Sequence, residues 1–411
     1  MSSHTPLATA AIIFAVASAA PALAVEDQDG QSPVSRSSGD KSSAVAPKKA
    51  EKKSEWQLKP RWRVQYDVAE IDGPTALPGA GSYDDLRRAR IGVDIKAPNG
   101  FLARVEGEFS TDPIEFTDAY VGWSGKGISV LAGQQKNFTP LDDMTSNLNT
   151  SFIERAAFST TFGYGRRTGI SAVYSKADWA IGGGVFTDPL ILLNDVKSNS
   201  LSADFRGYWE PKVGKAALHF GAAYHIRELN DFANITTRYR QRPLVRITDT
   251  RYIGTPALNV DREQRYGLEA AAVSGRFHGA AEVHWLNANR IGRADPTLFG
   301  GYVEAGVFLT KDTRPLKAGV FGAIKPHKPL GSGGIGAVQV NVRYDYLDLN
   351  SAGVTGGKQD GYLASLIWTP VDFVRLMANY ARLDYTDAII AVAGRRDYSV
   401  DVMAVRFQLN Y

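Results

Sequence analysis

The chain has 411 residues, with 47 Lys and Arg against 43 Asp and Glu, 40 Gly and no Cys. The lack of Cys excludes disulfide bonds and thiolate metal sites. The length fits two or three soluble domains or one large all-β barrel. We expect no nucleic-acid partner.

The first 24 residues have the pattern of a cleaved signal peptide. An apolar run from Ala8 to Ala20 precedes Ala22-Leu23-Ala24, which has the small-x-small form of a cleavage site. The first ten residues contain no Lys or Arg, which departs from that pattern. Residues 25–58 are rich in Ser, Lys, Asp and Pro, so we expect a flexible linker there.

Apolar and polar residues alternate from Lys59 onward. Trp62 and Val64 alternate with Arg61 and Arg63, which is the period-two pattern of a strand with one apolar face. After residue 24 there is no apolar run of the ~20 residues that a spanning helix needs, so a membrane chain of this kind must close into a barrel. The pattern predicts sixteen strands, at about 59–70, 85–97, 101–110, 116–123, 128–135, 166–175, 179–187, 197–209, 215–227, 262–273, 276–288, 299–310, 336–349, 360–369, 372–384 and 398–411.

Short turns alternate with long polar loops between these segments. Compact turns such as 98–100 and 124–127 contrast with loops at 136–165 and 228–261, and this alternation is typical of an outer-membrane barrel. An even strand number places both barrel ends on the periplasmic side. Residues 311–335 are too long for a short turn, and either an irregular strand or a plug would fit.

The last segment, from Asp401 to Tyr411, closes the chain. Its apolar residues alternate with small or polar ones, and it ends on an aromatic side chain. A barrel uses such a strand, with its apolar face towards lipid, as its last stave. Aromatic residues on the apolar phase, often near strand ends, predict the interfacial girdles of a membrane barrel.

Taken together, these segments make the sequence resemble the phosphate-selective porin family, whose founding members come from pseudomonads. The matching stretches are Leu86–Gly92 (LRRARIG), Asp118–Val121 (DAYV), Gly133–Lys136 (GQQK), Pro140–Ser146 (PLDDMTS), Phe152–Arg155 (FIER), Gly165–Gly169 (GRRTG), Gly301–Thr310 (GYVEAGVFLT), Arg314-Pro315 and Tyr344–Leu349. The resemblance covers about residue 59 to the end. It implies an all-β, sixteen-stranded transmembrane barrel, a homotrimer in the bacterial outer membrane, and passage of anions without catalysis or a cofactor.

The polar phase of the strands turns many charged side chains into the lumen. Arginine matches the oxygens of phosphate and carboxylate, and a ladder of such cations selects anions. For any single lumen arginine, the interpretation that we put first is that it braces the wall by pairing with an acid. The inward cations include Arg61, Arg63, Arg88, Arg90, Arg104, Arg206, Arg227, Arg343, Arg375 and Arg406, and the inward acids include Asp67, Asp94, Glu106, Glu108, Asp204, Glu269, Glu282 and Asp345.

The resemblance also implies a constriction site, because in this family the loop after the fifth strand folds into the pore. That loop is roughly Lys136 to Gly165 here. By position, the resemblance points to Arg87, Arg88 and Lys136 as the central anion site, although the strand phase turns Arg88 inward and leaves Arg87 at the rim. The full predicted set comprises Arg87, Arg88, Arg90, Arg104, Lys136, Asp118 and Arg155.

The constriction loop departs from the strict phosphate porins. Those proteins place a basic residue shortly after a Thr-Ser-Ser stretch, whereas residues 145–150 here are TSNLNT. Asp142, Asp143 and Glu154 outnumber Lys136 and Arg155, so an acidic loop facing an arginine wall would create the transverse field that general porins also use. The loop at 228–261 adds five arginines, which would either steer anions to the mouth or bind lipopolysaccharide phosphates.

These observations favour a passive channel for small anions, with phosphate or polyphosphate as candidates. The alternative is a non-specific porin for small hydrophilic solutes. A barrel enzyme is disfavoured because there is no Gly-x-Ser-x-Gly motif. His278, Glu282 and His284 share one inward face. They could bind a metal ion, but the simpler interpretation is that they line the lumen. An adhesin or structural barrel would conduct no ions.

Overall fold

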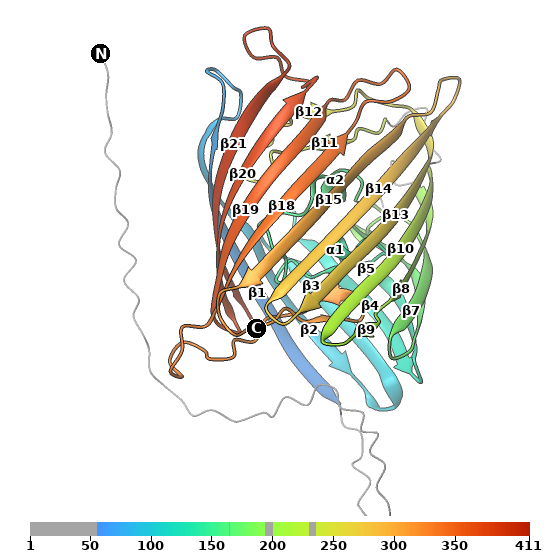
Figure 1. Ribbon diagram of the computed structural model, residues 1–411. Coiled ribbons are helices and arrows are strands. Elements are labelled where there is room, and N and C mark those ends of the chain that lie inside the picture. The colour runs from blue at the N-terminus through green and yellow to red at the C-terminus, as the bar shows by residue number, and fades with distance from the viewer. Residues whose placement is uncertain (1–55, 164, 194–199, 230–235) are drawn as a thin grey trace, which may run out of the picture. The chain divides into compact units, whose positions relative to one another are not determined.

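A computed structural model describes residues 56–163, 165–193, 200–229 and 236–411 (Figure 1). The predicted signal peptide and nearly all of the predicted linker lie outside these residues. The barrel strands run from Gln57 to Asn410.

Sixteen long strands form one closed antiparallel sheet, which confirms the predicted fold and strand number. A two-residue strand, β9 (Lys212–Val213), also pairs with the start of β10. The long strands are β1 (Gln57–Asp72), β2 (Gly81–Lys96), β3 (Phe101–Glu108), β4 (Glu115–Gly125), β5 (Ile128–Lys136), β6 (Arg166–Ser175), β7 (Trp179–Phe186), β8 (Ser200–Trp209), β10 (Ala216–Leu229), β13 (Val260–Ser274), β14 (Phe277–Arg290), β15 (Thr297–Phe308), β18 (Ala337–Asp348), β19 (Lys358–Val371), β20 (Val374–Thr386) and β21 (Tyr398–Asn410).

The barrel closes between its first and last strands. β1 pairs with β21 from Arg63 opposite Asn410 to Asp72 opposite Asp401. Backbone hydrogen bonds between Trp62 and Tyr411, at 3.2 and 2.9 Å, extend this seam to the chain end. The closing role predicted for the C-terminal strand is therefore confirmed.

Side chains alternate between lipid and lumen because successive residues of a strand point to opposite faces. On β21, Met403 and Val405 are 62% and 52% exposed on the outer face. Arg406, the next residue along the strand, points inward and is fully buried inside the barrel. Trp62, Tyr66 and other aromatic residues are exposed on the outer face, as predicted.

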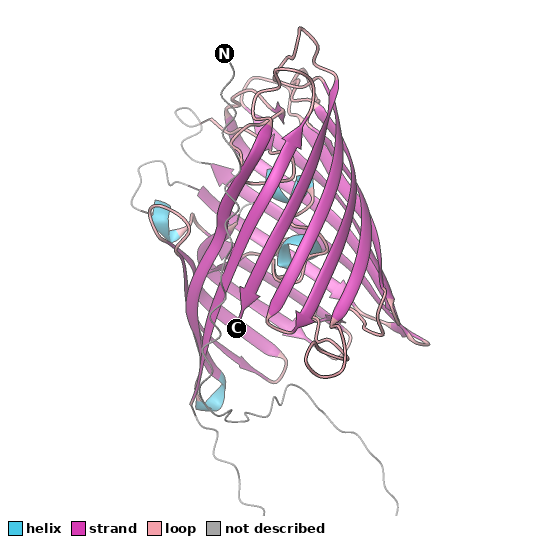
Figure 2. Cartoon of the chain, turned by 90° about the vertical axis from the view of Figure 1, so that its left-hand side faces the viewer, coloured by secondary structure: helices cyan, strands magenta, loops and turns pink. Residues whose placement is uncertain are grey.

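The two rims differ in the length of their connections (Figure 2). One rim carries short connections, among them the helical turn η1 (Pro98–Gly100), and holds the C-terminus. The other carries the long loops, which include η2 (Leu190–Leu192) and the hairpin of β11 (Arg240–Gln241) with β12 (Ile253–Gly254). The connection 309–336 is the exception on the short-turn rim, and it contains a hairpin of β16 (Leu316–Lys317) with β17 (Val320–Phe321).

The apolar core lies inside the barrel and is built on the loop 137–165, which contains α1 (Leu141–Met144) and α2 (Ala157–Thr161). Leu141, Phe152 and Phe158 of this loop are fully buried. Among the described residues, no helix is long and apolar enough to cross a bilayer.

Candidate functional site: a cationic cavity in the lumen

The loop 137–165, here called the constriction loop, is fixed to one side of the barrel. The backbone N–H of Leu141 donates to Glu269 on β13 at 2.8 Å, and that of Asp142 donates to Glu282 on β14 at 2.7 Å. On β20, Arg375 donates to the carbonyls of residues 148 and 150 at 2.8 and 2.6 Å. The loop therefore lies across the lumen, and among the described residues a space lies between it and the strands opposite.

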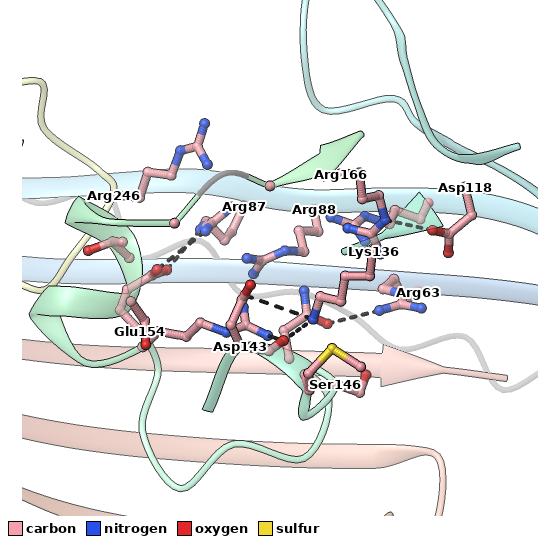
Figure 3. Close-up of a pocket in the computed structure, with 18 of the residues that line it drawn as sticks. Arg63, Arg87, Arg88, Asp118, Lys136, Asp143, Ser146, Glu154, Arg166 and Arg246 are labelled. Atoms are coloured by element: carbon pink, nitrogen blue, oxygen red, sulfur yellow. Dashed lines mark hydrogen bonds and ion pairs between the residues drawn. The ribbon is translucent and has the colours of Figure 1, made fainter. Parts of the chain in front are cut away.

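That space is a cavity of about 690 Å³ between the constriction loop, the first six strands and the loop that carries β11 (Figure 3). Thirteen cationic residues line it, against the three acids Asp118, Asp143 and Glu154. The cations are Arg61, Arg63, Arg87, Arg88, Arg90, Arg104, Lys136, Arg155, Arg166, Arg240, Arg242, Arg246 and Arg251.

A β-bulge on β2 turns two consecutive arginines into this cavity. Gln65 of β1 faces Arg88, but Asp67 faces Asp85, so Leu86 and Arg87 together oppose a single residue of β1. The bulge leaves Leu86 exposed to lipid and buries Arg87 and Arg88 on the inside. The prediction that Arg87 stays at the rim was wrong, because strict alternation does not hold across a bulge.

The two neighbouring arginines differ in their partners. Nε of Arg87 lies 2.9 Å from Oε1 of Glu154 on the constriction loop. Arg88 donates to Gln65 Oε1 at 2.7 Å, and its buried Nε has no hydrogen-bond partner. Among the described residues, no carboxylate lies within ion-pair distance of Arg88.

Most other cations on the strand wall are braced by acids. Arg104 pairs with Asp94 at 2.5 Å, Arg90 with Glu108 at 2.7 Å and Arg166 with Asp118 at 2.7 Å. Of these acids only Asp118 lines the cavity. The bracing interpretation thus describes these pairs.

Ion pairs also fix the acids of the constriction loop. Lys136 Nζ lies 3.9 Å from Oδ1 of Asp143, and Arg155 Nε lies 3.1 Å from the same atom. Burial raises the pKa of Asp143, but the charges of Lys136 and Arg155 outweigh it and hold the pKa well below its usual range. For Glu154, burial is likewise outweighed by Arg87 and then Arg406, and its pKa is also well below the usual range.

The expected acidic loop face is therefore only partly present. Asp142 is buried away from the cavity, where Oδ1 lies 3.6 Å from Arg343 and Oδ2 accepts from the N–H of Ala156. The two acids that do reach the cavity are bound to cations. A transverse field requires an unpaired acidic face opposite the arginines. The described residues do not form such a face.

The loop with β11 brings four of its five predicted arginines, Arg240, Arg242, Arg246 and Arg251, to the long-loop end of the cavity. Arg242 pairs with Asp249 at 2.6 Å, whereas Arg246 has no hydrogen bond or ion pair among the described residues. Burial, followed by repulsion from Arg242 and Arg240, lowers the pKa of Arg251 to about 10, so it remains charged at neutral pH.

The histidines considered as metal ligands have other neighbours. His278 Nε2 lies 2.9 Å from Asn341 Oδ1, and the ring of His284 stacks on Phe158 with centroids 4.5 Å apart. Across the part of the chain that the structure describes, no three His, Cys, Asp or Glu side chains are arranged to hold a metal ion.

The structure brings all seven residues of the predicted site to this one cavity. Sequence reasoning did not include Arg166, although it belongs to a stretch used for the resemblance and lies opposite Lys136 in the strand register. It also did not single out Arg61 and Arg63 from the other inward cations. The residues are gathered by strand order, which places β1 to β6 side by side.

Comparisons with known proteins agree with this geometry. The family described as phosphate-selective porin O and P matches residues 58–411. An uncharacterized protein of Caulobacter vibrioides is 43% identical over 364 residues, which cover 86% of this chain and 74% of that protein.

Two solved structures are each similar at a TM-score of 0.56 and cover 87% of this chain. The anion-selective porin from Comamonas acidovorans is 13% identical with its whole length (100%) matched, and OmpT, an outer membrane protein of Vibrio cholerae, is 12% identical with 98% matched. At these identities the structural likeness shows the fold.

Proposed function

Since the chain belongs to the phosphate-selective porin family, and is thus an outer-membrane channel, we propose that it passes small anions in preference to cations, with phosphate among them. The observation that carries this proposal is the cavity lining, where thirteen cations face three acids. A positive cavity with low-dielectric walls concentrates anions and excludes cations.

Arg88 is the proposed central contact for the anion. Its side chain is buried and lies beside the paired Arg87, and its hydrogen-bond partner among the described residues is the uncharged amide of Gln65. A phosphate oxygen in the cavity would accept a charge-assisted hydrogen bond from this guanidinium. Arg90, Arg104, Lys136 and Arg155 are proposed to hold the ion more weakly along the path, which lets it leave.

The second candidate is a general porin for small hydrophilic solutes. It is supported by the ion pairs, because bracing by Asp94, Glu108 and Asp118 reduces the charge that a solute experiences. A general porin would discriminate between chloride and phosphate only by size.

Assembly and export complete the proposal. We propose a homotrimer, since a trimer form is known for OmpT of Vibrio cholerae, which shares this fold at a TM-score of 0.53 and 11% identity. The segment 1–24 is proposed to direct export. Exposed arginines of the long-loop rim, such as Arg238 and Arg395, are proposed to contact lipopolysaccharide phosphates.

Titration of the chloride current with phosphate tests the anion site. Single channels in a planar bilayer are bathed in chloride solution, and phosphate is added up to millimolar concentration. The proposal predicts that phosphate reduces the chloride current in a saturable manner and that Arg88→Gln weakens the block. A chloride current that millimolar phosphate leaves unchanged would favour the general porin.

A further inference from the structure

Four inward side chains lie in one row across the closing seam of the barrel. Arg88 on β2 is opposite Gln65 on β1, and Gln65 is in turn opposite Gln408 on β21. Gln408 is opposite Arg375 on β20, and all four side chains are buried inside the barrel. The row therefore has an arginine at each end and two amides between them. Of the two arginines, Arg88 is the one that lines the cationic cavity.

The hydrogen bonds from Arg88 along this row all run in one direction. Arg88 Nη1 donates to Gln65 Oε1 at 2.7 Å, and Gln65 Nε2 donates to Gln408 Oε1 at 2.7 Å. Gln408 Nε2 then donates to the carbonyl of Leu148 on the constriction loop at 3.3 Å. A guanidinium can only donate and a carbonyl can only accept, so the two ends determine which way each amide between them is turned.

The neighbouring rows use carboxylates where this row uses amides. Two residues further along β1, Asp67 lies 2.6 Å from Arg406 on β21. Two residues earlier on β1, Arg63 lies 3.1 Å from Glu106 on β3. A carboxylate cancels the charge of the guanidinium that it holds, whereas an amide oxygen accepts the same hydrogen bond and leaves the net charge unchanged. The amides thus fix Arg88 without neutralising it.

We infer that Gln65 and Gln408 are positioning residues of the anion site, which orient the Arg88 guanidinium through uncharged groups and keep its full positive charge at the cavity. Neither amide is among the described residues that line the cavity, so both act through Arg88. The carbonyl of Leu148 belongs to the constriction loop, so the same bonds set Arg88 relative to that loop. The inference rests on the proposed anion channel and explains how its central arginine is both fixed and charged.

A double-mutant cycle tests whether Gln65 acts through Arg88. Gln65→Met has a similar length and the same net charge but removes both hydrogen bonds of the amide, and it is recorded alone and together with Arg88→Gln. Block of the chloride current by phosphate gives the half-blocking concentration. We expect Gln65→Met alone to raise this concentration by up to the roughly threefold effect of Arg88→Gln. In the Arg88→Gln background it should have no further effect.

The matched control is Gln135→Met on β5. Gln135 lines the cavity, and its Oε1 accepts from Ser171 Oγ at 2.7 Å. Any effect of this control on the half-blocking concentration should be the same with and without Arg88→Gln. An effect of Gln65→Met that is equally large in both backgrounds would overturn the inference.

A second substitution at the same position separates orientation from charge. Gln65→Glu keeps an acceptor for Arg88 but adds a negative charge that pairs with it. The anion preference in a KCl gradient should therefore fall in Gln65→Glu and stay at the wild-type value in Gln65→Met. Equal reversal potentials for these two variants would contradict the role of an uncharged partner.

Folding and the proposed function are checked separately. Heat-modifiable migration on SDS gels establishes that each barrel is folded. Where Gln65→Met does not fold, Gln408→Met carries the same cycle, because it removes the acceptor that orients Gln65. A wild-type current that phosphate does not block would instead contradict the proposed function. The cycle is then read on the chloride conductance, and equal effects of Gln65→Met with and without Arg88→Gln would still overturn this inference.

Discussion

Nε of Arg87 lies 2.9 Å from Oε1 of Glu154, and this pair joins the cationic strand wall to the constriction loop across the narrow part of the lumen. Within the described part of the chain, the adjacent Arg88 has no carboxylate at ion-pair distance. One residue of the β2 bulge thus fixes the loop, and the next is the residue that we propose contacts the anion.

Replacing Arg88 by Gln should reduce the preference for anions. Removing one unit charge at ~7 Å from an ion in a wet pore changes its energy by about 0.6 kcal/mol, which corresponds to about a threefold change in occupancy. Reversal potentials in a salt gradient measure the effect, and Arg88→Lys should retain most of the wild-type value. The exposed Arg276 on the short-turn rim offers a control, since Arg276→Gln should change little. Equal shifts for Arg88→Gln and Arg276→Gln would contradict a special role for Arg88.

Replacing Glu154 by Gln should have the opposite effect on selectivity and should also lower stability. The change removes the partner of Arg87 and one partner of Arg406, so the cavity gains uncompensated positive charge. We expect a stronger anion preference in bilayer recordings together with a lower thermal unfolding midpoint. A variant that becomes more cation-selective would show that Glu154 does not act through these arginines.

Acid should destabilise the constriction loop only at low pH. The folded pKa values of Asp143 and Glu154 are both held well below the usual range. Each ion pair therefore contributes stability that is fully present above the unfolded pKa of ~4 and is lost as the pH falls through the folded pKa. The difference in thermal unfolding midpoint between the wild type and Glu154→Gln, followed by circular dichroism, should stay constant from neutral pH to about pH 5 and shrink below ~4. A difference that shrinks already between pH 7 and 5 would contradict the ion-pair assignment of Glu154.

Arg406 should be far more important for stability than an arginine on the outer face. Its side chain is fully buried and its Nε and Nη2 each lie 2.6 Å from an oxygen of Asp67 across the closing seam, while Nη1 donates to the carbonyl of Ile153. Breaking such a buried pair costs about 3–5 kcal/mol. The matched control is Arg382, whose pair with Asp401 is exposed and is worth about 1 kcal/mol or less. The free energy of unfolding in detergent is measured for Arg406→Met and for Arg382→Met. Equal losses of unfolding free energy in the two variants would contradict this account.

Much of the barrel could be predicted from the sequence because the strand period is two residues and one face meets lipid. Met403 and Val405 on the outer face and Arg406 on the inner face of β21 follow that rule directly. Arg87 did not follow it, since a bulge adds one residue locally and leaves no mark in the alternation.

Contacts between distant segments lay beyond the sequence pattern. The inward path of the constriction loop was predicted from the family resemblance and not from the residue pattern. The acids of this loop were counted without knowledge of their partners, so Asp142 was placed at the pore although it faces Arg343. The connection 309–336 likewise depends on contacts of Arg314 with Glu304 and with the carbonyl of residue 149, which are joined only in the folded barrel.

The reversal potential of the wild-type channel in a KCl gradient across a planar bilayer tests the central claim most directly. A cavity with thirteen cations and three acids should give a potential of the sign that chloride permeation sets. A potential near zero, or one of the sign set by potassium, would contradict the account of an anion-preferring channel.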